Sequence, residues 1–312
     1  MKPSVFFLIV CFSFICNYAI SQPVTPNHRN KADSLMNEGN VPDAITEFKK
    51  LYKLNPKDKR VVYNYACALS IDNSVIKQFD SCFKYLNIAI ELDTSVTALT
   101  DPDFLPARED KKWAAFENRL ISMLNVKYNN PYQDIEYAKA LWRLGATDQA
   151  YFNEIGIAGR KLGMRSSVAS AIWKLKFMVQ KNSQKELEQL VAAKGWPKVN
   201  EVGKEAAMCA YLVAMHTNDG SQKKYLPMIR QSCEKGELPW QRYANIYDRC
   251  LFNDNKPQKY GTHTRFNELT KSEELYPLED EIKVDELRKE IGLEPLADYL
   301  AKLNIKYQPK QK

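Results

Sequence analysis

Histidine is scarce in this chain, since only His28, His216 and His263 occur among its 312 residues. The sequence also lacks the Gly-rich loop that cradles phosphates, the Gly-x-Ser-x-Gly turn that presents a nucleophilic serine, and the His-Glu-x-x-His pair that binds zinc. These absences argue against enzymes that are recognised by any of these three motifs. Any chemistry would therefore have to come from residues that are dispersed along the chain.

Blocks of one charge sign are missing as well. Lys and Arg number 45 against 38 Asp and Glu, which gives a formal net charge of +7, but the two signs are interspersed. Nucleic-acid binding requires a focused basic patch, so we predict no nucleic-acid partner. The lysines at the C-terminal end are expected to form a solvated basic tail over residues 306–312.

One long apolar run is present, and it lies at the N-terminus. Lys2 precedes an apolar run over residues 5–15, and the small residues Ala19 and Ser21 stand where a signal peptidase reads the chain. We predict a signal peptide over residues 1–21 and an exported chain, periplasmic or extracellular. The run is short for a bilayer span, so we expect no membrane span in the mature chain.

Closely spaced cysteine pairs are absent, which argues against a zinc or redox motif. Cys16 lies in the predicted signal peptide, and its acylation in a lipoprotein is a second-ranked alternative. The cysteines of the mature chain are expected to be buried free thiols on apolar helix faces, with one disulfide left open. They are Cys67, Cys82, Cys209, Cys233 and Cys250.

Helical periodicity begins near residue 29, after a polar linker at 22–28. Small residues alternate with large apolar ones at helical spacing from Gly39 to Pro56, and the pattern recurs further on, with a short insertion near residues 73–77. The positions concerned include Ala44, Phe48, Tyr65, Ala66, Leu86 and Ala89. This pattern resembles tetratricopeptide repeats over residues 29–128. The resemblance implies paired helices that bind a peptide or protein, although about three repeats is the minimum for an independent core.

The remainder, residues 129–305, carries polar and turn-forming residues in a definite order. They are Asp148 and Gln149, Trp196 and Pro197, His216, Asp248 and Arg249, Gln258, Tyr260, Gly261 and Thr262, then Gly292, Leu293, Pro295 and Leu296. This order resembles a bacterial family of unknown function, which implies a module and names no reaction. His263 departs from the family pattern by replacing a Gln, and Phe152 with Asn153 stands where the family has an Arg.

These patterns predict a mostly α protein, with a short tetratricopeptide-like array of helical hairpins packed on a helical module with a small β-hairpin. The break near Pro131 suggests a domain boundary at residue 129. Ser183 should cap a separate helix through a capping box, and Gly195 should end that helix. Pro239 and Pro295 should each start a later helix. The hairpin is expected to start at Lys259, so that Tyr260 and Thr262 share a strand face and His263 lies opposite.

Three residues are catalytic candidates. His216 ends a predicted helix, where the helix dipole favours the imidazolium, so it could act as a base that Asp248 orients. Arg249 could bind an anion. The ligand-binding candidates are Asp148, Gln149, Gln258, Tyr260, Thr262 and His263.

Each candidate also has a structural interpretation. His216 could simply cap its helix, and Asp248 with Arg249 could form a structural ion pair. A metal site from His216, His263 and Asp248 has suitable ligand types but no tight spacing, so we predict no metal and no cofactor.

We therefore predict an exported binding protein whose array and module contact a protein or a small molecule. The alternative is a cell-envelope hydrolase or transferase with an acid/base site around His216 and Asp248. Candidate side chains that converge in an open pocket would favour the enzyme. Side chains that are buried and mutually hydrogen-bonded would favour the binding protein.

Overall fold

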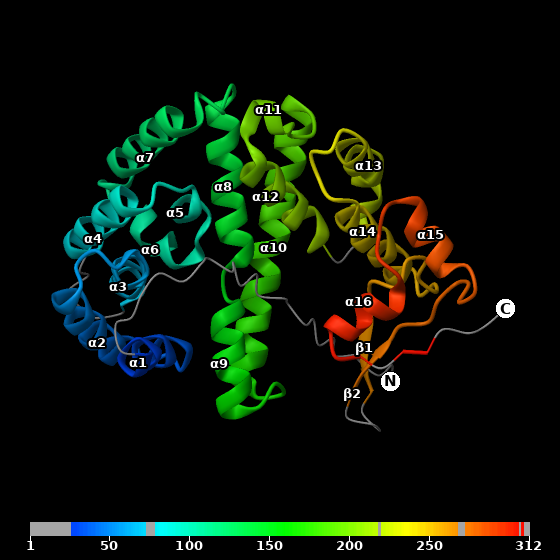
Figure 1. The fold of residues 1–312 in the computed structure, drawn as a ribbon, viewed down its shortest axis with the longest axis horizontal. Coiled ribbons are helices and arrows are strands. Elements are labelled where there is room, and N and C mark those ends of the chain that lie inside the picture. The colour runs from blue at the N-terminus through cyan, green and yellow to red at the C-terminus, as the bar shows by residue number, and fades with distance from the viewer. Residues whose placement is uncertain (1–25, 73–78, 218–219, 268–271, 306, 309–312) are drawn as a thin grey trace. The chain divides into compact units, whose positions relative to one another are not determined.

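The structure is a computed structural model that describes residues 26–72, 79–217, 220–267, 272–305 and 307–308 (Figure 1). The described chain is mostly helical with one two-stranded antiparallel sheet, which confirms the predicted mostly α fold with a small β-hairpin. None of its helices combines the length and apolarity that a bilayer crossing requires. The predicted signal peptide lies outside the described residues.

Contacts divide the described chain into an N-terminal unit, residues 26–210, and a C-terminal unit, residues 211–308. The boundary predicted at residue 129 lies inside the N-terminal unit. Helix α8 (Ile135–Gln149) follows that point in the sequence, yet it packs against α5 (Thr97–Thr100), which precedes it. The predicted boundary is not visible in these contacts and stays a prediction.

The N-terminal unit is entirely helical in its described part. Besides α5 and α8 it contains α1 (Pro26–Asn37), α2 (Val41–Leu54), α3 (Lys59–Ile71), α4 (Phe79–Leu92), η1 (Pro102–Phe104), α6 (Leu105–Arg108), α7 (Trp113–Tyr128), α9 (Phe152–Leu162), α10 (Ser167–Lys194), α11 (Val199–Val202) and most of α12 (Lys204–Met215). Helix α1 begins at Pro26, so the last residues of the predicted linker are helical.

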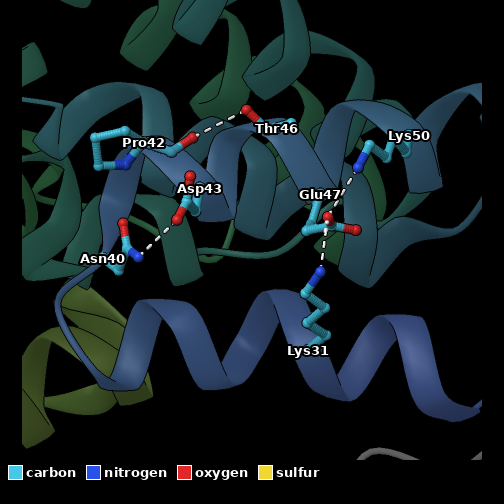
Figure 2. Close-up of polar contacts among 7 residues, drawn as sticks. All are labelled: Lys31, Asn40, Pro42, Asp43, Thr46, Glu47 and Lys50. Atoms are coloured by element: carbon cyan, nitrogen blue, oxygen red, sulfur yellow. Dashed lines mark hydrogen bonds and ion pairs between the residues drawn. The ribbon is translucent and has the colours of Figure 1, made fainter.

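Helices α1 and α2 form a pair that polar contacts hold in register (Figure 2). The Asn40 amide donates to Asp43 across the first turn of α2 at 2.8 Å. Further along, Glu47 is nearly buried and accepts from Lys31 of α1 at 3.1 Å and from Lys50 of α2 at 2.9 Å. One carboxylate on α2 thus ties its own helix to its neighbour.

Helices α3 and α4 form the next pair, and small residues lie between large ones in its core. Six of the positions that carried the tetratricopeptide resemblance are buried: Ala44, Phe48, Tyr65, Ala66, Leu86 and Ala89. The helical pairing is therefore established for this part of the chain. The predicted insertion between the two helices, near residues 73–77, lies outside the described residues.

Helix α10 runs unbroken from Ser167 to Lys194, which corrects the prediction of two helices separated at Ser183. Ser183 is buried within the helix and caps nothing. Serine disfavours a helix interior only slightly and no Gly or Pro stands nearby, so the helix continues. It ends at Gly195, whose φ of +79° suits glycine and matches the predicted end.

The C-terminal unit combines helices with the small sheet. Its elements are η2 (Ser221–Tyr225), α13 (Leu226–Glu234), α14 (Trp240–Asn253), β1 (Thr264–Asn267), β2 (Ser272–Leu275), α15 (Val284–Glu290) and α16 (Leu296–Lys302). Pro239 and Pro295 stand at the starts of α14 and α16, as predicted. The buried apolar side chains of this unit include Leu296 and Leu300, against which Leu278 and Tyr299 pack.

The first strand of the hairpin begins later than predicted, at Thr264 and not at Lys259. Strands β1 and β2 pair from Thr264 opposite Leu275 to Asn267 opposite Ser272. Residues 258–263 precede the strand, and Gly261 has a φ of +72°, which ends any extended run. Residues 258–263 therefore do not alternate between the two faces of a strand, which corrects the prediction for Tyr260, Thr262 and His263.

The five cysteines of the described chain are buried and carry free thiols, as expected. Burial raises the pKa of Cys82 and of Cys209 to about 12. Burial also raises the pKa of Cys233 and Cys250 to about 11. A thiol nucleophile must ionise near neutral pH, so these four cysteines are poor candidates for that role.

Candidate functional site

Residues 259–262, which follow α14, surround the carboxylate of Asp248. This residue lies on α14 and is fully buried. Its Oδ1 accepts the backbone N–H groups of Lys259 at 2.8 Å and Tyr260 at 3.0 Å. Its Oδ2 accepts the backbone N–H of Thr262 at 3.0 Å and the Thr262 hydroxyl at 2.9 Å. Asp248 therefore organises the backbone that follows α14.

The protonation of Asp248 depends on two opposing effects. Burial raises its pKa, because a low-dielectric surrounding disfavours the carboxylate. The N–H groups of Tyr260, Thr262 and Lys259 oppose the rise, because they stabilise the charged form. The ionised carboxylate is the form that all four donors recognise.

Gln258 closes the base of the hairpin with its amide. Its Nε2 donates to the carbonyl of His263 at 2.9 Å and to that of Tyr276 at 2.7 Å. Its Oε1 accepts the backbone N–H of His263 at 2.8 Å. The backbone of Gln258 bonds to Pro277 and Glu279 on the other side. Because both amide protons and the amide oxygen are engaged, this side chain has an internal structural role.

Gly261 lets the backbone turn and lets α16 approach. With its φ of +72°, an L side chain would be strained. A Cβ at this position would also lie 2.6 Å from Leu296 Cδ1 and 3.4 Å from Leu278 Cδ2. Gly261 of the Gly-Thr pair and Leu296 of the Pro-Leu pair therefore pack directly against each other.

Arg288 completes this arrangement, and the sequence analysis missed it. Its fully buried guanidinium donates from Nη1 to the Tyr260 carbonyl and from Nε to the Glu294 carbonyl, each at 2.7 Å. It also lies 4.9 Å from the centre of the Tyr299 ring. Arg288 occurs on α15 among other charged residues, so its sequence context suggests an exposed position. Its closeness to Gly292 and Pro295 was the one usable signal.

Thr262 and His263 form a short polar chain that starts at Asp248. The Thr262 hydroxyl oxygen lies 3.0 Å from Nδ1 of His263. Because the hydroxyl proton is directed at Asp248, Nδ1 has to carry a hydrogen for this contact to be a hydrogen bond. The His263 ring stacks on Phe252 with centroids 5.9 Å apart. Burial, and then the charge of Arg249, lower the pKa of His263 to about 3, so its ring is neutral at physiological pH.

The hydrogen bonds to the Asp248 carboxylate in the described chain come from residues other than the two further catalytic candidates. Among the described residues, the hydrogen-bond donors to its carboxylate are Lys259, Tyr260 and Thr262, and His216 is not one of them. His216 follows α12, and its backbone N–H bonds to Leu212. Arg249 places its guanidinium 5.7 Å from the centre of the Phe252 ring. The catalytic roles of His216 and Arg249 stay predictions.

Asp148 and Gln149 lie in the N-terminal unit, at the end of α8. Gln149 donates its amide to Asp148 Oδ2 at 2.8 Å, and the Asp148 carbonyl accepts from the ammonium of Lys176. Lys176 is fully buried on α10, 3.8 Å from the centre of the Phe152 ring. Phe152, which departs from the family pattern, thus packs against the ammonium of buried Lys176. The sequence did not single out this lysine. The other seven candidates lie in the C-terminal unit.

Metal ligation by His216, His263 and Asp248 finds no geometric basis. In the part of the chain that the structure describes, these three are not grouped at ligand distance. Cys67, Asp101 and Asp103 of the N-terminal unit are grouped in that way. None of these residues belongs to the sequence motifs.

Comparison with known proteins covers the C-terminal part of the chain only. No curated protein and no solved structure matches the chain. No tetratricopeptide family model was found for the N-terminal helices. A family model described as a family of unknown function (DUF6624) matches residues 136–312, which is more than half of the sequence, and the chain belongs to this family.

Proposed function

We propose that the chain is an exported binding protein, in which the polar motif of the C-terminal unit builds a rigid module and performs no reaction. Export rests on the sequence pattern of residues 1–21. The observation that carries the proposal is the mutual hydrogen bonding of the motif. The carboxylate of Asp248 and the amide of Gln258 direct their bonds to the neighbouring backbone.

A hydrolase or transferase at the same residues has less support. Such an enzyme needs a base with room for a substrate proton, and it needs a partner that orients the base. Asp248 is buried and receives four donors from residues 259–262. His263 is neutral, because its pKa lies near 3, and its ring stacks on Phe252. Neither side chain is arranged to exchange protons with a substrate near neutral pH.

The partner class follows from helix α10, which lies within the family-matched region. Four large apolar side chains are exposed on it: Val168 at 46%, Leu175 at 48%, Phe177 at 47% and Met178 at 64%. Val168, Leu175 and Met178 follow one another at helical spacing along one face. A contiguous exposed apolar face is typical of protein-binding surfaces. The proposed ligand is therefore a protein segment with an apolar face.

The test compares two exposed sites in the full chain. Leu175→Glu combined with Met178→Glu places charge on the α10 face, and Val126→Glu places it on α7, where the side chain is 87% exposed. Each protein is treated with a lysine cross-linker in an envelope fraction, and melting checks the fold. Adducts that disappear only in the α10 variant support the proposal. Adducts that are retained in both variants, or lost in both, contradict it.

A further inference from the structure

Three possible metal ligands meet in the N-terminal unit, outside the family-matched region. They are the thiol of Cys67 on α3 and the carboxylates of Asp101 and Asp103, which flank Pro102 at the start of η1. One ligand atom from each lies within 4.8 Å of the others. The three side chains come from segments 34 residues apart, which pack because η1 lies against α3.

Neighbouring groups fix the direction of the Asp101 carboxylate. Its Oδ1 accepts the backbone N–H of Asp103 at 2.9 Å, and its Oδ2 accepts the Tyr63 hydroxyl at 2.7 Å. Tyr63 lies one helical turn before Cys67, and its ring packs edge-on against Phe104 at 5.6 Å. Hydrogen bonds of this kind orient the ligands of protein metal sites.

The Cys67 thiol is a separate observation that points to the same place. It comes from a different element than the two carboxylates, and only 4% of the residue is exposed. Its sulfur lies 3.9 Å from Asp101 Oδ2, which is long for a hydrogen bond. Within the described chain, neither Asp101 nor Asp103 has a lysine or arginine at ion-pair distance, although the positive charge of Arg108 acts on Asp101 from further away. A buried thiol thus points at two carboxylates that have no ion-paired cation.

We propose that Cys67, Asp101 and Asp103 bind one divalent cation of the zinc class, with Tyr63 as the residue that orients Asp101. A thiolate with two carboxylates suits Zn²⁺, whereas Ca²⁺ and Mg²⁺ take oxygen ligands only. Ligand atoms in a tetrahedral zinc site lie about 3.3–3.8 Å apart, which follows from bond lengths of about 2.0–2.3 Å. The observed group therefore closes around the ion through a movement of about 1 Å.

Binding releases the thiol proton. The Cys67 S–H bond breaks, its electron pair forms the S–metal bond, and one proton passes to solvent, with no change of oxidation state. Each carboxylate contributes one oxygen, which leaves a fourth position for water or for a group of a partner. Three protein ligands with one open position are typical of zinc sites that contact a further molecule.

The experiment uses Co²⁺ as a probe on the full chain after treatment with a chelator and dialysis. A Co²⁺–thiolate bond gives an intense near-ultraviolet absorption band. We expect this band to saturate at one equivalent, to disappear when Zn²⁺ is added, and to persist when Ca²⁺ is added. Cys67→Ser should abolish the band, and Asp103→Asn should weaken Co²⁺ binding by at least about tenfold.

Cys82→Ser is the matched control, because Cys82 is an equally buried thiol outside the group, and it should keep the band. Circular dichroism without metal checks that each variant folds. If Cys67→Ser does not fold, Tyr63→Phe replaces it and should keep the band while weakening affinity about tenfold. Absence of the band in the wild type, or a band that depends on Cys82 and not on Cys67, overturns the proposal.

Discussion

Asp248 and Arg288 both hydrogen-bond to the backbone of Tyr260. The Tyr260 N–H donates to Asp248, at 3.0 Å to Oδ1 and 3.2 Å to Oδ2, and the Tyr260 carbonyl accepts from Arg288 Nη1 at 2.7 Å. Both charged side chains are fully buried, and the backbone lies between them. A buried anion and a buried cation are thus each compensated by peptide dipoles. The following predictions test this arrangement.

Asp248→Asn should destabilise the fold although it keeps the shape of the side chain. The new amide group would face backbone N–H groups, so a donor would meet donors. We expect a loss of about 3–5 kcal/mol in the free energy of unfolding, measured by urea denaturation. Asp254→Asn, which removes a solvent-screened surface pair with Lys223 just after α14, should change the free energy of unfolding far less. Equal losses in the two variants would contradict the role assigned to Asp248.

Arg288→Lys should also destabilise the protein, because an ammonium cannot reach two carbonyls in the geometry of a guanidinium. The variant loses one of the bonds to Tyr260 and Glu294 and keeps a buried charge. We expect a loss of about 2–3 kcal/mol. Arg265→Lys on the exposed side of β1 is the control and should change stability by no more than about 0.5 kcal/mol. If Arg288→Lys changes stability as little as this control does, the hydrogen bond from Arg288 to the Tyr260 carbonyl contributes little to stability.

Gly261→Ala should cost about 2–4 kcal/mol, through a strained φ and through the collision with Leu296. Gly292→Ala separates the two effects, because Gly292 has a similar φ of +69° and no atom within 4 Å of the added Cβ. That variant should lose only about 1 kcal/mol. Denaturant unfolding of both variants measures the difference. Similar losses would show that packing against α16 contributes little.

His263→Gln should make the protein more resistant to acid. The pKa of His263 falls from 6.5 to about 3 on folding, so the unfolded chain binds this proton more readily than the folded one. The stability from the neutral ring is complete above pH 6.5 and is lost as the pH falls towards 3. Between about pH 7.5 and 4.5 the wild type should lose roughly 2–3 kcal/mol more than the variant.

Urea denaturation at the two pH values gives this difference directly. The His263→Gln variant restores the residue type that the family resemblance places at this position, so it is expected to fold. An identical pH dependence in both proteins would show that His263 is solvated in the folded state.

The fold was predictable wherever one residue marks a helix end. Pro239, Pro295 and Gly195 stand at the predicted ends because proline restricts the backbone locally and glycine permits a positive φ. Ser183 misled, because a capping box is a weak signal within a sequence of good helix formers. The first strand of the hairpin was placed too early, because the turn at Gly261 depends on contact with Leu296, which lies 35 residues later.

The candidate site was predictable in its residues and only partly in their roles. Asp248 accepts from the Thr262 hydroxyl, and Gln258 donates to the carbonyl of the neighbouring His263. Arg288 and Lys176 were missed because a buried cation on an amphipathic helix has the same local sequence as an exposed one. Their burial is decided by tertiary packing, which local periodicity does not contain.

The amide of Gln258 separates the hairpin strands from the packing of the C-terminal unit. Its three bonds join residues 258, 263 and 276 below the strands, so β1 and β2 leave from a base that is already closed. Extra residues inserted between Asn267 and Ser272 would lengthen the ribbon and leave that base intact. Relatives are therefore expected to differ in length at this point, and an affinity tag or a fluorescent label can be inserted there without disturbing Asp248.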